Sequence, residues 1–116
     1  RKLRDGGVNV CIATNNIRNA FTPYGNGDIL QTAMLAIPVA HLGGADDLPT
    51  VLPMITENPA KALGLEGYGI AEGNKADLVV LDTKLVHDAI IDITTRLYVI
   101  KNVKITVETT KTTKVY

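Results

Sequence analysis

The sequence is poor in the residues that build disulfide and metal frameworks. Its 116 residues include one cysteine, two histidines, one phenylalanine and no tryptophan. Cys11 has no partner for an internal disulfide, so we expect a reducing compartment, the cytoplasm, and a cysteine that is buried as a small apolar side chain. No Cys-x-x-Cys pair or Cys–His zinc spacing is present. His41 lies in an apolar helical stretch and His87 between predicted strands, so we expect a structural or solvent-exposed role for each.

Charge of either sign is not in excess. The chain carries 12 basic and 12 acidic residues, a balance that does not indicate a nucleic-acid or membrane-surface protein. The longest apolar stretch, residues 34–42, contains Pro38 and His41 and is too short to span a bilayer, which needs about 20 residues. The first residues, RKLRDGG, include neither methionine nor an apolar signal segment. We therefore expect no signal peptide, and expect Arg1 to lie inside a longer protein.

The apolar share of 46% is enough for one small packed domain. The first half predicts a helix–strand–loop–helix order. A helix ends at Gly6-Gly7, residues 8–13 (VNVCIA) form a buried strand of a parallel sheet, and residues 14–27 form a loop. Asp28 is expected to cap a largely buried helix over residues 29–42, kinked at Pro38.

The second half changes from helical to strand patterns. Residues 47–55 predict a helical region, and Asn58 and Pro59 are expected to cap and begin another helix that ends near Gly64. A glycine-rich loop follows, and the remaining segments read as strands. These are residues 76–82, 90–94, 96–101 and 103–109, with a turn at Lys101-Asn102. We place the domain boundary between residues 66 and 67.

The order of elements in the first half is that of a repeat unit of a (β/α)8 barrel. In that fold the loop after each strand carries function, which draws attention to residues 14–27. A complete barrel needs about 250 residues. The chain can therefore hold only the last unit of an incomplete barrel.

Two long motifs resemble a known family. Residues 57–82 (ENPAKALGLEGYGIAEGNKADLVVLD) resemble the C-terminal signature of the amidohydrolase superfamily, in which an N-P-A helix precedes a small β-sandwich. Residues 14–43 (TNNIRNAFTPYGNGDILQTAMLAIPVAHLG) resemble its cytosine deaminase-like branch. The resemblance implies an α/β fold. Residues 1–66 would supply strand 8 of a TIM barrel, the active-site loop and the following helices, and residues 67–116 the C-terminal part of a β-sandwich.

The resemblance also implies a chemistry. Members of this superfamily hold one or two divalent metal ions, Zn or Fe, and a metal-activated water attacks an amidine or amide carbon. The expected reaction is hydrolytic deamination of a cyclic amidine, a pyrimidine- or triazine-like small molecule. The catalytic aspartate of strand 8, which contacts the metal and shuttles the proton, falls on Asn15. Asn16 falls on a position that borders the substrate, and Phe21 on an aromatic that packs over the heterocycle.

Departures from the family pattern leave alternatives open. An amide at Asn15 offers a neutral carbonyl oxygen in place of a carboxylate, and the family's H-x-H ligands are absent. We therefore expect the chain alone to be inactive and to bind no metal by itself. The alternative is a catalytically dead homologue or fragment that serves as a structural or interaction module. Because a lone barrel strand has exposed edges, we expect homo-oligomerisation or association with the missing part of the barrel.

Individual residues also have plainer interpretations. Asn15 and Asn16 suit an ordinary loop, and Phe21 could pack in the core beneath that loop. Arg18 could bind an anionic group or lock the loop. Asp28 is favoured as a helix cap over an acid catalyst.

Overall fold

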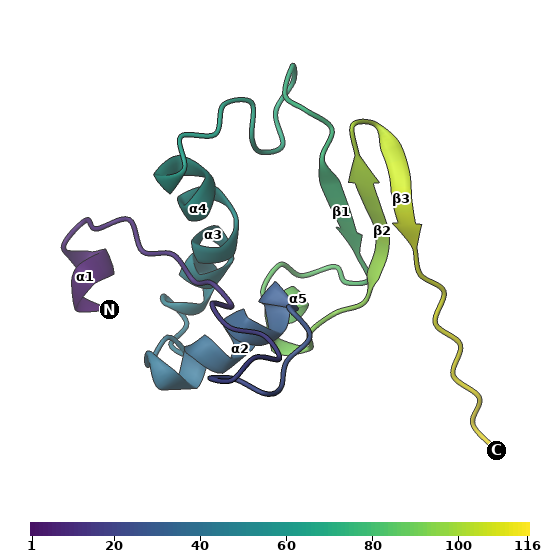
Figure 1. Ribbon diagram of the computed structural model, residues 1–116, viewed down its shortest axis with the longest axis horizontal. Helices are drawn as coiled ribbons and strands as arrows, with labels where there is room; N and C mark the ends of the chain where they lie inside the picture. Colours follow the sequence, from purple (N-terminus) through teal and green to yellow (C-terminus); the bar gives the residue numbers. More distant parts are fainter.

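The computed structural model describes residues 1–116 and consists of short helices followed by a small sheet (Figure 1). The helical elements are α1 (Lys2–Asp5), α2 (Ile29–Val39), the 3-10 turn η1 (Leu48–Thr50), α3 (Val51–Ile55), α4 (Glu57–Ala62) and α5 (Asp88–Ile91). The strands are β1 (Leu78–Leu81), β2 (Arg96–Lys101) and β3 (Lys104–Glu108). No helix in the structure is both long enough and apolar enough to cross a membrane.

The three strands form one antiparallel sheet in the order β1-β2-β3. Their valines and isoleucines suit the pleated backbone, and the sequence placed all three close to their observed bounds. Asn102 and Val103, both at positive φ (48° and 67°), join β2 to β3, as a tight hairpin with two left-handed turn residues requires. The predicted turn was therefore one residue too early.

The core lies among α2, α3 and α5, and Leu81 of β1 packs against it. Its buried side chains are Leu30, Ala33, Leu42, Val51, Met54 and Ile90. Only 10 of the 116 residues are buried, and the accessible surface is 8821 Å². A compact monomer of 12.4 kDa would expose about 6,100 Å². The chain thus exposes roughly 2,700 Å² more than that, an excess on the scale of a large protein interface.

Residues 8–13, predicted as a buried strand of a parallel sheet, form no strand within this chain. The segment is extended but pairs with no strand, because no other parallel strand exists in the chain. It lies instead along α3 and α4, where the Ile12 amide donates to the Met54 carbonyl at 2.9 Å and Val10 and Ile12 pack against the core. Cys11, expected to be buried, is exposed because the hollow that it lines is open to solvent.

One strand prediction and two helix predictions also need correction. Residues 90–94 form no strand. Ala89 and Ile90 are buried in α5, which contacts α2, so tertiary packing overrides the strand preference of the β-branched Ile90. Helix α4 begins at Glu57, which places Asn58 inside its first turn. Helix α2 ends at Val39, one residue after Pro38, instead of kinking there and continuing to residue 42.

Candidate functional site

The candidate site is the loop of residues 14–27, which joins the extended segment 8–13 to α2. Its end is fixed by Asp28, whose Oδ1 accepts hydrogen bonds from the amides of Leu30 (2.9 Å) and Gln31 (3.4 Å). The predicted helix cap at Asp28 is confirmed. The same carboxylate also accepts hydrogen bonds from both terminal nitrogens of Arg96, the first residue of β2.

The pKa of Asp28 reflects both influences. Burial raises the pKa of this carboxyl, but the hydrogen bond from Arg96 and the amides of Gln31 and Leu30 together outweigh it. The net effect is a pKa below the ordinary 3.8. Asp28 is therefore an anion at neutral pH, with its oxygens occupied by the helix and by Arg96. An acid catalyst would need a free oxygen there, so the cap is its role.

The loop closes on itself through backbone and arginine contacts. The Arg18 amide donates to the Tyr24 carbonyl (3.3 Å), and the Asn19 amide to the Thr22 carbonyl (2.9 Å). Arg18 adds a bond from its Nε to the Gly25 carbonyl at 3.0 Å. Of the two roles left open for Arg18, the structure supports the locking of the loop.

Neutral amides organise the inside of the loop. Asn19 Oδ1 accepts from the amides of Phe21 and Thr22, both at 3.0 Å. Asn19 Nδ2 donates to Asn16 Oδ1 at 2.7 Å. The structure therefore joins Asn16 to the loop framework. This bond needs an amide donor at position 19, so Asn19 serves here in a way that a carboxylate could not.

Asn15 and Phe21 have exposed side chains, whereas Asn16 is partly buried. Asn15 has φ of 57°, a left-handed conformation in which asparagine is enriched, and its exposed side chain makes no hydrogen bond within the chain. Phe21 is 87% exposed. The alternative that Phe21 packs beneath the loop is therefore wrong. The loop presents an unpaired amide and an uncovered aromatic ring, two groups that suit a flat polar heterocycle.

The donor set does not fit a divalent metal ion. Nowhere in the structure do three His, Cys, Asp or Glu side chains converge on one point. His41 is an exposed residue just beyond α2, and His87 lies 3.5 Å from Asp88 at the start of α5. Asn15 would be a single weak ligand, so these residues alone do not form a metal site.

Two residues that fix the site were missed or misassigned from the sequence. Asn58, expected as a helix cap, donates from Nδ2 to the Val10 carbonyl at 2.8 Å, and Asn9 Nδ2 donates to the Asn58 carbonyl at 2.9 Å. This reciprocal pair fastens the segment that leads into the loop. The Asn-Pro dipeptide was the available signal. No sequence pattern around Arg96 indicated its contact with Asp28.

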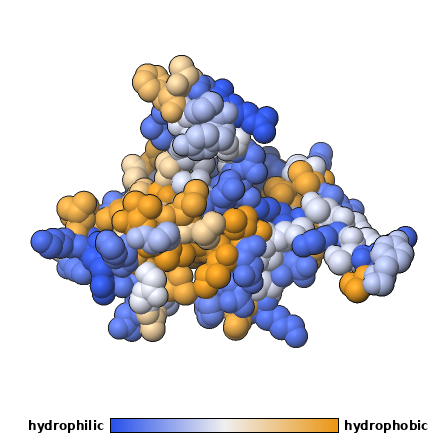
Figure 2. Space-filling view, turned by 90° about the horizontal axis from the view of Figure 1, so that it is seen from below, coloured by the Kyte–Doolittle hydropathy of each residue, from blue (hydrophilic) through white to orange (hydrophobic).

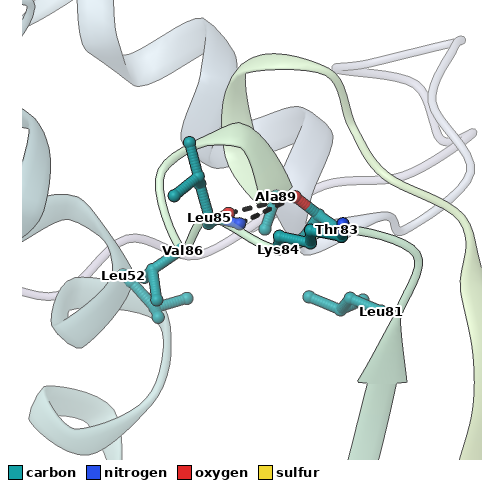
Figure 3. A pocket seen from close by; sticks show the side chains of 7 residues that line it. All are labelled: Leu52, Leu81, Thr83, Lys84, Leu85, Val86 and Ala89. Carbon is teal, nitrogen blue, oxygen red and sulfur yellow. Dashed lines mark hydrogen bonds between the residues drawn. The ribbon is translucent and has the colours of Figure 1, made fainter.

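Two hollows lie outside the loop. One, of about 150 Å³, is lined by Leu52, Leu81, residues 83–86 and Ala89 (Figure 3). It is smaller than a typical ligand pocket of about 300 Å³ or more, and Thr83 Oγ1 forms hydrogen bonds with the backbone of Leu85 beside it.

The other hollow, of about 500 Å³, lies between α1, residues 10–12 and the end of α2. Figure 2 shows apolar side chains gathered across the face of the molecule seen from below. Neither hollow includes Asn15, Asn16 or Phe21.

Known proteins share both the sequence and the fold. The chain is 44% identical over 108 residues to N-isopropylammelide isopropyl amidohydrolase of Pseudomonas sp. (strain ADP), an alignment covering 92% of this chain and 27% of that protein. The liganded structure of 5-methylcytosine deaminase from Klebsiella pneumoniae with phosphonocytosine superposes with a TM-score of 0.94 at 33% identity, over 99% of this chain and 28% of that one.

A third similar protein is N-isopropylammelide isopropylaminohydrolase from Burkholderia multivorans ATCC 17616. Its structure gives a TM-score of 0.84 at 30% identity, over 90% of this chain and 27% of that one. The chain thus spans about a quarter of the length of these relatives. The resemblance to the cytosine deaminase-like branch is confirmed. Because the profile of the amidohydrolase family also matches residues 1–111, the chain belongs to the amidohydrolase family.

Proposed function

We propose that this chain supplies the final β/α unit and the adjoining sheet of a cytosine deaminase-like amidohydrolase. The reaction is hydrolysis of a cyclic amidine, a pyrimidine- or triazine-like ring, to the ring carbonyl with release of ammonia or an amine. The observation that carries this proposal is the near-complete superposition on 5-methylcytosine deaminase, together with a loop that leaves Asn15 and Phe21 open to a ligand.

Each loop residue has a role in this proposal. Asn15 stands in the proton-shuttle position. Its amide can accept a hydrogen bond from a ring amino group and donate one to a ring carbonyl, but it cannot take up a proton near neutral pH. Asn16, held by Asn19, borders the ring edge. Phe21 stacks on the ring face, as an exposed aromatic side chain can.

The rest of the catalytic apparatus lies outside residues 1–116 in this proposal. The amidohydrolase family is generally metal-dependent, and a bound divalent ion would supply an activated water. Residues 1–66 form the part that faces the substrate and residues 67–116 the sheet that supports it. The excess accessible surface and the hollow beside Val10 and Cys11 support packing against further protein, from the same polypeptide or from another copy.

The second candidate is a catalytically dead homologue kept as a structural or interaction module. It is favoured by the amide at Asn15 and by the absence of a convergent ligand set within these residues. The two candidates predict the same fold and the same exposed loop. They differ in whether a bound cyclic amidine is also hydrolysed.

The test is turnover by the natural polypeptide that carries residues 1–116. It is loaded with Zn or Fe and given cytosine, 5-methylcytosine and N-isopropylammelide, and release of ammonia or isopropylamine is measured. The enzyme proposal expects release that Asn15→Asp increases. Asn26→Asp is the matched control, since an aspartate there can still accept the bond from the Asp28 amide and Asn26 has no assigned role at the substrate. Binding without release, in both the natural protein and Asn15→Asp, would favour the dead homologue.

A further inference from the structure

A charged pair joins the end of the candidate loop to the sheet. Arg96 Nη1 donates to Asp28 Oδ2 at 2.7 Å, and Arg96 Nη2 donates to Asp28 Oδ1. The two residues are 68 positions apart in the sequence. Their side chains are only 28% and 17% exposed. A bidentate, largely shielded pair of this kind has a defined geometry as well as a favourable energy.

The sheet is locally irregular where Arg96 leaves it. Arg96 opposes Leu81, and the register between β1 and β2 shifts between Val80 and Leu81. Such irregularities re-aim side chains at the ends of strands. Here the backbone irregularity accompanies a guanidinium that reaches out of the sheet toward the first turn of α2.

From Asp28 the contacts continue into the loop. The Asp28 amide donates to Asn26 Oδ1 at 2.9 Å. The neighbouring Gly27 lies so close to Ile17 that a β-carbon added there would stand 3.2 Å from the Ile17 side chain. Ile17 immediately follows Asn16. Asp28 is therefore the point at which the sheet, the α2 terminus and the loop meet.

We infer that Arg96 is a positioning residue for the candidate site: through Asp28 it holds the loop of residues 14–27 in the conformation that presents Asn15, Asn16 and Phe21. The inference rests on the proposed function for the identity of the site. It assigns to the sheet a part in ordering the loop, because the sheet supplies the guanidinium and the loop ends on the carboxylate.

A second pair in the same sheet provides a matched control. Lys101, at the other end of β2, contacts Asp77, with side chains 62% and 31% exposed. This pair joins β2 to the residue before β1 and touches no part of the loop. Removing it perturbs the charge and stability of the sheet alone. A purely structural role for Arg96 predicts that its loss acts as the loss of Lys101 does.

The experiment measures amide hydrogen exchange in the natural polypeptide without substrate, for Arg96→Met, Arg96→Lys, Asp28→Asn, the double variant and Lys101→Met. Asp28→Asn keeps an oxygen for the helix cap and removes the charge. In Arg96→Met, the exchange of the Arg18 and Asn19 amides, both bonded across the loop, is expected to rise about tenfold. Arg96→Lys should rescue part of this change, and Lys101→Met should leave the loop amides unchanged.

The double variant decides whether the two residues act through each other. Coupling predicts that Arg96→Met adds little once Asp28→Asn is present. Independent, multiplicative effects on exchange, or equal loop exchange in Arg96→Met and Lys101→Met, would overturn the inference. If Arg96→Met does not fold, Arg96→Lys and Asp28→Asn decide by the same comparison.

Turnover separates this inference from the proposed function. In an active natural protein, Arg96→Met should lower kcat/KM about tenfold, with partial rescue by Arg96→Lys. Coupled loop exchange with no turnover by any variant would contradict the proposed function alone. Turnover that is unaffected by Arg96→Met would contradict the positioning role alone.

Discussion

Replacement of Asn58 by aspartate probes the contact that fastens the chain entering the site. Asn58 Nδ2 donates to the Val10 carbonyl at 2.8 Å, and both groups are partly buried. Asn58→Asp is nearly isosteric. It removes the only donor of this pair and sets a carboxylate oxygen against a carbonyl oxygen.

The magnitude follows from the groups involved. Leaving the partly buried Val10 carbonyl without its donor costs about 1–3 kcal/mol. A negative charge in the first turn of α4 stabilises the folded state by only about 0.3 kcal/mol, because α4 is a short helix. We expect the free energy of unfolding to fall by about 2 kcal/mol.

The assay is urea unfolding at neutral pH, combined with exchange of the Ile12 amide, which donates to the Met54 carbonyl. Gln31→Glu is the control. It makes the same amide-to-acid change on the exposed face of α2 and should alter stability by no more than about 0.5 kcal/mol. The reasoning is refuted if Asn58→Asp unfolds like Gln31→Glu and leaves the exchange of Ile12 unchanged.

Three further predictions concern the cap, the core and the ring. The pKa of Asp28 is lowered in the folded state, so its contribution to stability is present above pH 3.8, the ordinary value, and is lost as pH falls through the lower folded value. In urea unfolding, the stability gap between natural protein and Asp28→Asn should therefore narrow on acidification, and a gap that widens would contradict this. Ile90→Ala, at a side chain 1% exposed, should cost about 2–4 kcal/mol by the cavity it leaves, measured by thermal or urea unfolding; a cost under about 1 kcal/mol would exclude Ile90 from the core. Phe21→Ala should change stability by less than about 0.5 kcal/mol while weakening binding of a cyclic amidine about 3- to 10-fold in calorimetry, and unchanged affinity would remove Phe21 from the site.

Local signals in the sequence predicted the features that depend on neighbouring residues. The cap at Asp28 follows from its own carboxylate and the apolar helix after it. Strand β2 was predicted with its observed bounds, and β1 and β3 within two residues, because alternation and β-branching suit a half-buried sheet.

Features that depend on distant residues could not be predicted. Residues 8–13 have the composition of a buried strand, but a ladder needs a neighbour, and the segment is held instead by Met54 and Asn58. Ile90 and Ile91 favour a strand by propensity, yet packing of Ile90 in the core makes this segment helical. The pairing of Asp28 with Arg96 joins residues that no local pattern connects.

The location of the candidate site is a prediction from motifs, whereas its internal bonds could be seen only in the structure. The motif over residues 14–43 led to Asn15, Asn16 and Phe21. The internal bonds from Asn19 and the exposure of Phe21 required the structure, because a loop's conformation depends on contacts that its composition does not specify.

The most direct test of the candidate site is to map where a cyclic amidine binds. Backbone chemical shifts of the natural polypeptide are followed by NMR as 5-fluorocytosine or phosphonocytosine is added. The loop site predicts saturable shifts that centre on the amides of residues 15–21 and that Phe21→Ala reduces. Shifts centred on the hollow beside Leu52, Leu85 and Val86 (Figure 3), or none at saturating ligand, would contradict the assignment of this loop as the functional site.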